Sequence, residues 1–194
     1  MQRTLVVMVK EPHPGRVKTR LGRDIGLIDA AWWYRHQSAA LLRRLRDPRW
    51  DLVLAVSPDC AGLRSRVWPD DLLRVPQGRG DLGQRMLRQL AIAPRGPVCL
   101  VGSDIPGLRR PHVAGAFAKL GGHDIVFGPA TDGGYWLIGV NGRRAVPIDT
   151  LRDVRWSGPH ALQDSIAAVS DRRIALTTML RDVDTASDLA DIER

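Results

Sequence analysis

Short apolar runs alternate along the chain with longer segments in which apolar residues recur at helical spacing. Runs such as "LVVMV", "LVLAV" and "VCLVG" are continuous, which is typical of strands buried on both faces of a mostly parallel sheet. The apolar runs predict strands at Thr4–Lys10, Asp51–Ser57, Leu72–Val75, Pro97–Gly102, Asp124–Phe127, Tyr135–Val140 and Ile174–Thr178.

Helices are predicted between these strands, at Ile28–Leu45, Asp81–Ala93, Pro111–Leu120, Pro159–Val169 and Thr185–Ile192. Proline opens the third and fourth of them, and T-x-x-D opens the last, which is a capping-box-like start. The alternation predicts an α/β fold, a three-layer α/β/α arrangement around a mixed, mostly parallel sheet. We find no repeat, low-complexity tract or linker, so residues 1–194 are predicted to form a single domain.

Composition is that of a soluble globular protein, with 44% hydrophobic and 26% charged residues. No apolar run approaches the roughly 20 residues that span a bilayer. The run Leu5–Val9 is shorter than a signal-peptide core of about 7–15 residues, so a cytoplasmic location is expected. Cys60 and Cys99 stand far apart without metal-ligand spacing, and we interpret both as reduced, structural thiols.

A net charge of +8 indicates an anionic partner. The arginines are spread along the chain, without the dense basic run and interleaved aromatic residues of a nucleic-acid binder, so neither nucleic acid nor a membrane is the expected partner. The sequence has 26 arginines but only 3 lysines, and two of these, Lys10 and Lys18, fall close together. Because an ammonium and a guanidinium are not interchangeable at a phosphate, this favours a specific role for the segment between them.

Ligands of open α/β sheets bind at the carboxyl ends of the strands, so the segments after the predicted strands are informative. They read "EPHPGRVKTRLG", "PQGRGDLG", "SDIPGL", "GPATDGGY" and "RDVDTASDL". All five are rich in glycine, proline, aspartate or cations. Their agreement predicts a polar site of the kind that binds phosphates and a metal ion.

The first of these segments offers Gly15, Arg16, Lys18 and Arg20. Glycine lets backbone N–H groups approach a phosphate, and cations can close over it. A Walker A motif is excluded, because Val17 stands where that motif needs glycine before the lysine. An anion-binding loop is predicted, and an exposed basic loop without a ligand is the alternative.

"GRGDLG", residues 78–83, spells G-x-G-x-x-G between a predicted strand and a predicted helix. A dinucleotide fingerprint is one interpretation, with Asp104 near the place of a ribose-binding acid. Against it, Asp81 would stand at the helix N-terminus and repel a pyrophosphate. A loop that contacts a nucleoside is favoured, and a structural turn is the remaining alternative.

Aspartates follow two of the predicted strands. Asp104 ends one, and "RDVDTASDL" supplies Asp182 and Asp184 after another. Mg²⁺ in transferases is typically held by one or two carboxylates and the substrate's phosphates, so Asp104 and Asp184 could form such a pair. Helix capping is the alternative for both, although Thr185 can cap in place of Asp184.

Two further features are ambiguous. Asp132 and the glycines after it form either a tight turn or a substrate loop whose backbone approaches a ligand. His160 lies near a predicted helix start and is either a structural residue or an acid, base or ligand contact. No Ser/His/Asp order and no His/Cys zinc cluster is evident.

Taken together, "KEPHPGRVKTRLG", "PQGRGDLGQRM", "GSDIPGL", "GPATDGGYWLIG", "VRWSGPHAL" and "RDVDTASDL" resemble a bacterial family of uncharacterised transferases with the glycosyltransferase-A, or nucleotide-diphospho-sugar transferase, fold. The resemblance covers essentially the whole chain. More distantly, the pattern is similar to 2-phospholactate guanylyltransferases and molybdenum-cofactor guanylyltransferases.

The resemblance implies a role for each segment. It implies that the phosphates are bound by Gly15, Arg16, Lys18 and Arg20, and that the base and ribose are contacted by Gln77, Gly78 and Gly83. It implies Mg²⁺ or Mn²⁺ ligands at Asp104 and Asp184, with Lys18, Arg20 and Asp104 catalytic. The acceptor side is expected at Asp132, Gly133, Gly134, Tyr135 and His160.

The expected function is Mg²⁺-dependent transfer from a nucleoside triphosphate or nucleotide-sugar to a small phosphorylated or hydroxyl acceptor. Nucleotidyl transfer is favoured, because only Asp104, and no D-x-D, follows the fourth predicted strand. Pro12 and Pro14 replace the glycines usual in a nucleotidyltransferase loop, which keeps glycosyl transfer as the alternative. A dinucleotide-dependent oxidoreductase and a non-catalytic nucleotide-binding protein are further alternatives.

Overall fold

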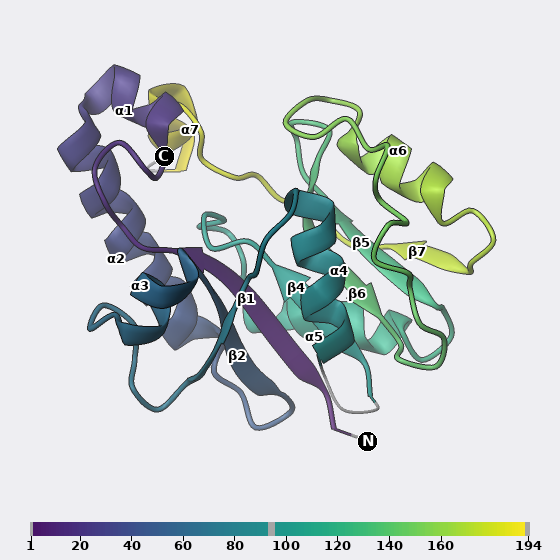
Figure 1. Ribbon diagram of the computed structural model, residues 1–194. Coiled ribbons are helices and arrows are strands. Elements are labelled where there is room, and N and C mark those ends of the chain that lie inside the picture. The colour runs from purple at the N-terminus through teal and green to yellow at the C-terminus, as the bar shows by residue number, and fades with distance from the viewer. Residues whose placement is uncertain (1, 93–95, 193–194) are drawn as a thin grey trace.

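A seven-stranded mixed sheet runs through the centre of the molecule, and helices cover both of its faces (Figure 1). The structure is a computed structural model and describes residues 2–92 and 96–192. The strands lie in the order β3-β2-β1-β4-β6-β5-β7. Their bounds are β1 Thr4–Lys10, β2 Asp51–Ser57, β3 Leu73–Pro76, β4 Val98–Val101, β5 Ile125–Pro129, β6 Tyr135–Val140 and β7 Ile174–Leu176.

Strand direction decides where the loops gather. β1 is parallel to β2 and β4, β2 is parallel to β3, and β5 is parallel to β7. β6 alone runs antiparallel to its neighbours β4 and β5 among the described strands. The carboxyl ends of the parallel strands therefore meet at one edge of the sheet, together with the first residue of β6.

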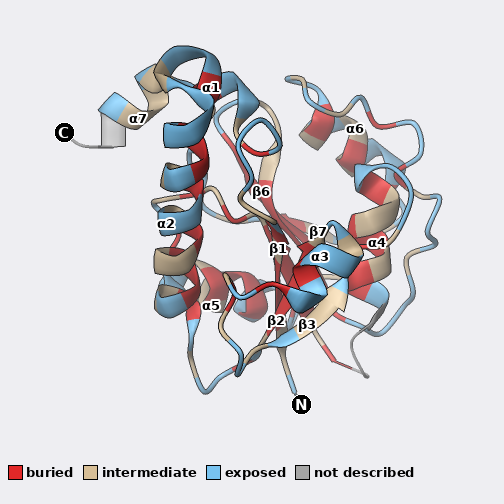
Figure 2. Cartoon of the chain, turned by 60° about the vertical axis from the view of Figure 1, so that its left-hand side comes forward, coloured by how far each residue is buried: buried red, intermediate tan, exposed pale blue. Residues whose placement is uncertain are grey.

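Two helical layers enclose the sheet. The helices are α1 Thr19–Ile25, α2 Leu27–Leu45, α3 Asp59–Arg64, α4 Leu82–Ile92, α5 Arg110–Lys119, α6 Ala161–Ala168 and α7 Ala186–Ile192. α2 and α5 contribute to one apolar cluster, and α4 and α6 to the other. Figure 2 shows their buried positions turned toward the strands. Within the described residues, no helix combines the length and apolar character needed to cross a membrane.

The two apolar clusters explain why the strand sequences are continuous rather than alternating. In β1, Leu5, Val7 and Val9 belong to the cluster under α2 and α5, whereas Val6 belongs to the cluster under α4, with Met8 packed against it. Every side chain of the run thus meets a helical layer. Burial on both faces is the reason that the pattern identified a mostly parallel sheet.

The predicted fold class is confirmed, and all seven predicted strands are present. β1, β2 and β6 have the predicted bounds, and the other boundaries shift by one or two residues. The five predicted helices are also present; the predicted end of one, Ala93, lies outside the described residues.

Two short helices were not predicted. α1 begins at Thr19, inside the segment expected to be a loop, and α3 follows β2. They have seven and six residues, too few for a helical apolar period to be recognised. The loop expected at residues 10–22 therefore ends earlier, at Lys18.

A pair of glycine substitutions tests the packing. At Gly128 in β5, a Cβ would lie 2.4 Å from the ring of the buried Trp136. At Gly115 in α5, a Cβ would meet nothing within 4 Å. Gly128→Ala should lower the free energy of unfolding by about 1–3 kcal/mol through overpacking. Gly115→Ala should raise it by about 0.5–1 kcal/mol through helix propensity. Urea titrations that gave both variants the same sign would contradict this packing.

Candidate functional site

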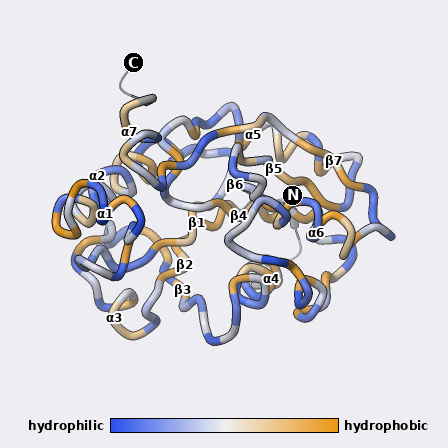
Figure 3. The backbone as a smooth tube through the Cα atoms, turned by 90° about the horizontal axis from the view of Figure 1, so that it is seen from above, coloured by the Kyte–Doolittle hydropathy of each residue, from blue (hydrophilic) through white to orange (hydrophobic). Residues whose placement is uncertain are grey.

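A cavity of about 660 Å³ opens at the sheet edge where the parallel strands end. Figure 3 looks onto this end of the molecule and shows mainly hydrophobic strands surrounded by loops with many hydrophilic positions. The predicted site residues that line the cavity are Arg16, Lys18, Arg20, Gln77, Asp104, Tyr135 and Asp184. The folded chain thus brings together residues from all five of the segments singled out in the sequence.

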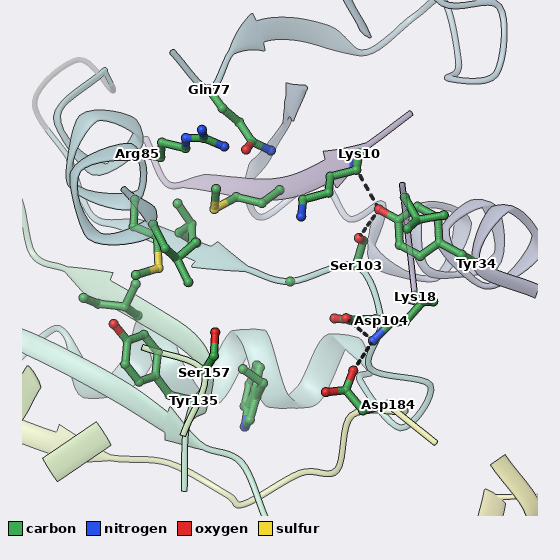
Figure 4. Close-up of a pocket in the computed structure, with 18 of the residues that line it drawn as sticks. Lys10, Lys18, Tyr34, Gln77, Arg85, Ser103, Asp104, Tyr135, Ser157 and Asp184 are labelled. Carbon is green, nitrogen blue, oxygen red and sulfur yellow. Dashed lines mark hydrogen bonds and ion pairs between the residues drawn. The ribbon is translucent and has the colours of Figure 1, made fainter. Parts of the chain in front are cut away.

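Lys18 stands at the centre of this arrangement. Its Nζ lies 2.5 Å from Asp104 Oδ2 and 2.8 Å from Asp184 Oδ1 (Figure 4), and its side chain is only 6% exposed. Burial by itself lowers the pKa of Lys18, but the charges and hydrogen bonds of the two carboxylates outweigh it and raise the pKa overall. The ammonium therefore stays charged and joins two loops that lie far apart in the sequence.

The backbone at Lys18 is unusual. Lys18 precedes α1 in the left-handed region, with φ 45° and ψ 47°, which is uncommon for a residue with a side chain. Such strain persists only where the surroundings impose it, and it concentrates at functional sites. Here the imposed conformation accompanies the placement of the ammonium between Asp104 and Asp184.

A small cluster of buried apolar side chains lies beneath the same ion pairs. Leu21 of α1 and Val183, next to Asp184, are both fully buried and pack in one cluster with Ala30 of α2. The Val183 N–H also donates to the Asp104 carbonyl oxygen, at 3.4 Å. The segments that carry the charged groups are therefore held by packing and by backbone hydrogen bonding, as well as by the ion pairs.

Helix capping does not account for the two carboxylates. Thr185 and Asp188 cap α7 through reciprocal hydrogen bonds, so the Asp184 carboxylate faces Lys18 and Arg20 instead. The N-terminus of α5 is closed by Arg109 and His112 rather than by Asp104. The capping alternative is therefore wrong for Asp104 and Asp184.

Asp182 is a site residue that the sequence interpretation did not select. It lines a second, smaller cavity beside Asp104 and Asp132. Burial, followed by the negative charges of Asp132, Asp104 and Asp184, raises the pKa of Asp182 to about 6. The available signal was its position two residues before Asp184, because alternate residues of an extended segment share one side.

The carboxylates suit a metal ion only in part. Among the described residues, no group of three His, Cys, Asp or Glu side chains could hold a metal ion. Asp104 uses one oxygen for Lys18, and its side chain is 32% exposed at the cavity. A divalent ion at Asp104 and Asp184 would therefore need further ligands, such as substrate phosphates and water.

Two cations on the other side of the cavity also escaped the sequence interpretation as site residues. Lys10 at the end of β1 and Arg85 of α4 both line the cavity (Figure 4). The side chains of Lys10 and Arg16 have no carboxylate within ion-pair distance in the described part of the chain, and Arg85 donates to the Gly80 carbonyl. The rarity of lysine was the signal for Lys10, whereas nothing distinguished Arg85 among 26 arginines.

Tyr34 of α2 fixes the ends of two strands. Its hydroxyl oxygen accepts the Lys10 N–H at 2.9 Å and lies 2.8 Å from Ser103 Oγ (Figure 4). The residue is buried, and burial raises the pKa of its hydroxyl. Tyr34 thereby links α2 to β1 and to the turn that carries Asp104.

The predicted base and ribose residues are placed unevenly. Gln77 lines the cavity, and its amide nitrogen donates to the carbonyls of Val9 and Ala55. Gly78 and Gly83 line neither cavity. Gly83 instead packs within α4, where a Cβ would lie 2.8 Å from the ring of Trp156. Close helix packing thus accounts for Gly83.

Asp81 supports the argument against a dinucleotide fingerprint. It precedes α4, and its Oδ1 accepts the Gln84 N–H at 2.8 Å. The N-terminus of α4 is therefore already capped by a carboxylate. An anionic pyrophosphate at that position would meet a like charge.

The expected acceptor residues divide between the second cavity and its surroundings. This cavity has a volume of about 200 Å³ and is lined by Asp132, Gly134 and Tyr135, among others. Gly133 has φ 85° and packs against Pro159, which leaves no room for a Cβ. His160 precedes α6 at an exposed position, and neither it nor Gly15 lines either cavity.

Comparisons with known proteins bear on this site. The bacterial protein family described as "Uncharacterized protein conserved in bacteria (DUF2064)" matches residues 40–158, more than half of the chain. No curated protein matches the sequence significantly.

Solved structures show where the fold recurs. A protein of Desulfovibrio desulfuricans G20, assigned as a nucleotide-diphospho-sugar transferase, is 30% identical, with a TM-score of 0.89 over 100% of this chain and 87% of that one. CMP:2-keto-3-deoxy-manno-octonic acid synthetase, complexed with CTP, is 10% identical, with a TM-score of 0.60 over 99% and 97%. Rv0371c of Mycobacterium tuberculosis H37Rv, in complex with manganese, is 16% identical, with a TM-score of 0.53 over 99% and 98%. These structures confirm the predicted nucleotide-diphospho-sugar transferase fold and the predicted class of enzyme, a transferase.

The hydroxyl of Tyr34 provides one test of the site. Tyr34→Phe should lower the free energy of unfolding by about 1–3 kcal/mol, because the part-buried Lys10 N–H and the buried Ser103 hydroxyl lose their partner. Tyr135→Phe is the matched control, since the Tyr135 hydroxyl makes only a 3.3 Å bond with Ser165 and should cost less. Chemical denaturation measures both, and an equal or larger loss for Tyr135→Phe would contradict the linking role of Tyr34.

Asp182 provides a test with a pH signature. A carboxyl whose pKa is raised by folding destabilises the native state above that pKa, so Asp182→Asn should raise stability at pH 8 in EDTA. The gain should decline as the pH falls through about 6 and vanish below the unfolded pKa of about 4.

Asp124 provides the control of opposite sign. The hydrogen bond from Arg173 lowers the pKa of Asp124 to about 2, so Asp124→Asn should lose stability at neutral pH and lose less as the pH falls. Urea titrations across this pH range measure both variants. A gain in the free energy of unfolding of Asp182→Asn that did not depend on pH would show that folding does not raise the pKa of the Asp182 carboxyl.

Proposed function

The chain belongs to the bacterial family described as "Uncharacterized protein conserved in bacteria (DUF2064)", and we propose that it is a single-domain transferase, dependent on Mg²⁺ or Mn²⁺, that uses a nucleoside triphosphate or a nucleotide-sugar. Nucleotidyl transfer to a small acceptor is the favoured reaction. The observation that carries the proposal is the Lys18 ammonium held between Asp104 and Asp184 at the sheet edge where α/β proteins bind ligands.

Charge on the larger cavity supports a phosphate-bearing substrate. Its lining includes five cations and three carboxylates, and Lys10 and Arg16 have no ion-pair partner in the described part of the chain. Cations gathered at one cavity attract anions, and water and salt partly screen the exposed side chains of Lys10 and Arg16. A di- or triphosphate supplies the charges that these side chains lack.

The carboxylate pair supports a divalent cation. Asp104 and Asp184 would hold Mg²⁺ or Mn²⁺ together with the phosphates, and the ion would neutralise phosphate charge when bound. The manganese complex of the mycobacterial structural neighbour agrees with this, although its 16% identity relates the two proteins by fold alone. The ammonium of Lys18 balances the same carboxylates in the structure described here.

The proposed reaction needs positioning and electrostatics rather than a protein nucleophile. An acceptor oxygen attacks the α-phosphorus, the bond from that phosphorus to the bridging oxygen breaks, and pyrophosphate leaves. Lys10, Lys18 and Arg20 stabilise the negative charge that accumulates on the leaving phosphates. The acceptor proton passes to a neighbouring carboxylate or to water.

Glycosyl transfer is the second candidate. It is favoured by the 30% identity to a protein assigned as a nucleotide-diphospho-sugar transferase, which this chain matches over its whole length. In that reaction the acceptor oxygen attacks the anomeric carbon, and a nucleoside diphosphate leaves. The finer likeness to guanylyltransferases recommends guanine nucleotides as the first substrates to test.

Thermal-shift measurements with nucleoside triphosphates and nucleotide-sugars, with and without Mg²⁺, test the proposal. The wild-type protein should be stabilised by at least one nucleotide in a Mg²⁺-dependent manner, and not by NAD(P). Asp104→Asn should weaken the Mg²⁺-dependent binding of that nucleotide at least about tenfold, since it removes one of the two proposed carboxylate ligands of the metal ion. Asp70→Asn is the control, because the Asp70 side chain is 99% exposed and lies outside both cavities.

Product analysis separates the candidate reactions. Release of pyrophosphate indicates nucleotidyl transfer, and release of a nucleoside diphosphate indicates glycosyl transfer. Nucleotide binding without turnover on any acceptor would support a non-catalytic binding protein. Unchanged nucleotide and metal binding in Asp104→Asn would overturn the proposed site.

A further inference from the structure

The smaller cavity forms a chamber that adjoins the larger cavity, on the phosphate side of the site. It lies between the turn after β5 and the segment before α6, and it shares seven lining residues with the larger cavity, among them Asp104, Tyr135 and Ser157. At about 200 Å³ it is smaller than the roughly 300–1,000 Å³ typical of drug-sized ligand pockets. A second, small reactant placed there would face the phosphates across Asp104.

The charge of this chamber is opposite to that of the larger one. Three carboxylates line it, from Asp104, Asp132 and Asp182, and none of the described residues in its lining is a lysine, arginine or histidine. Nearby cations are engaged elsewhere. Lys18 bonds to Asp104 from the larger cavity, and Arg155 forms a bidentate pair with Asp164 at 2.8 and 2.9 Å.

The remaining lining offers aromatic rings and hydrogen-bonding groups. Tyr135 and Trp156 meet edge to face, with ring centroids 6.3 Å apart. The indole Nε1 of Trp156 is buried and has no hydrogen-bond acceptor within the described part of the chain. Aromatic faces cover C–H surfaces and attract cations, while carboxylates accept hydrogen bonds from hydroxyl and ammonium groups.

We propose that this chamber holds the acceptor, and that the acceptor is a small uncharged or cationic alcohol without a phosphate or carboxylate group. The inference rests on the proposed function and narrows its acceptor. A phosphorylated acceptor would bring its negative charge into a chamber with three carboxylates and, among the described residues of its lining, no cation to neutralise it. Such a burial of like charges is strongly unfavourable where water is partly excluded.

The test compares matched pairs of small molecules that differ by one phosphate. The pairs are glycerol and glycerol 3-phosphate, glucose and glucose 6-phosphate, and choline and phosphocholine. Wild-type protein is first saturated with Mg²⁺ and inorganic pyrophosphate, which occupy the cationic cavity and prevent a phosphorylated probe from binding there. Saturation-transfer NMR then measures the affinity of each probe.

At least one uncharged or cationic member of a pair should bind, and its phosphorylated counterpart should bind at least about tenfold more weakly. The ratio of these two affinities is the quantity to compare between variants. In the double variant Asp132→Asn, Asp182→Asn, that ratio should fall to within about threefold. The Asp132→Asn change can keep the turn, since it retains a side-chain oxygen for the Gly134 N–H, which donates to Asp132 Oδ1 at 2.9 Å. Asp70→Asn is the control for net charge and should leave the ratio unchanged.

Each outcome decides between the two proposals. If pyrophosphate does not bind to the wild-type protein, the proposed function fails, and this inference fails with it. If pyrophosphate binds, this inference alone is overturned by any of three results: no uncharged or cationic member binds, the phosphorylated members bind equally well or better, or the ratio is unchanged in the double variant. Retained pyrophosphate binding by the double variant shows that it is folded.

Discussion

The ion pairs of Lys18 with Asp104 and Asp184 are the constraint on which the rest of the site depends. They join the loop after β1, the turn after β4 and the segment after β7 at one edge of the sheet. The ammonium is almost fully buried, so removing one carboxylate would leave it with a single ionic partner and would lower the stability of the fold. The same pairs hold both carboxylates against one ammonium.

The reversal of β6 gives the site its two chambers. Because β6 runs against β4 and β5, its first residue, Tyr135, reaches the edge at which the parallel strands end. The turn that precedes it carries Asp132 to the same edge. Tyr135 lines both cavities: the larger one also has cations from β1, α1 and α4 as well as carboxylates, whereas the smaller one has carboxylates but, among the described residues of its lining, no cation. The mixed sheet therefore places two adjoining cavities, the proposed phosphate and acceptor sites, at one edge in a chain of only 194 residues.

Much of the fold could be predicted because burial on both faces leaves a continuous apolar run for each strand, as in β1 and β2. Lys18, Asp104 and Asp184 could be selected because each lies in a polar segment that follows such a run. Gly83 and His160 were harder to place, since a local motif does not reveal whether a residue faces a cavity or a neighbouring helix. Arg85 could not be found at all: its position depends on which side of α4 meets the sheet edge.

The distribution of charge also bears on the order of events at the site. Lys18 lies between Asp104 and Asp184, and Arg20 also pairs with Asp184, so two cations neutralise the two carboxylates before any ligand binds. An anionic donor of the proposed kind would then meet no net negative charge from this pair. The smaller cavity keeps the carboxylates of Asp132 and Asp182, and Asp182 carries its negative charge only at a cost, as its raised pKa shows. A triphosphate donor is still anionic with one divalent cation bound, so it adds to this negative charge and should favour protonation of Asp182 and binding of a cationic acceptor. By linkage, donor and acceptor binding are then coupled through electrostatics alone, without a movement of the chain.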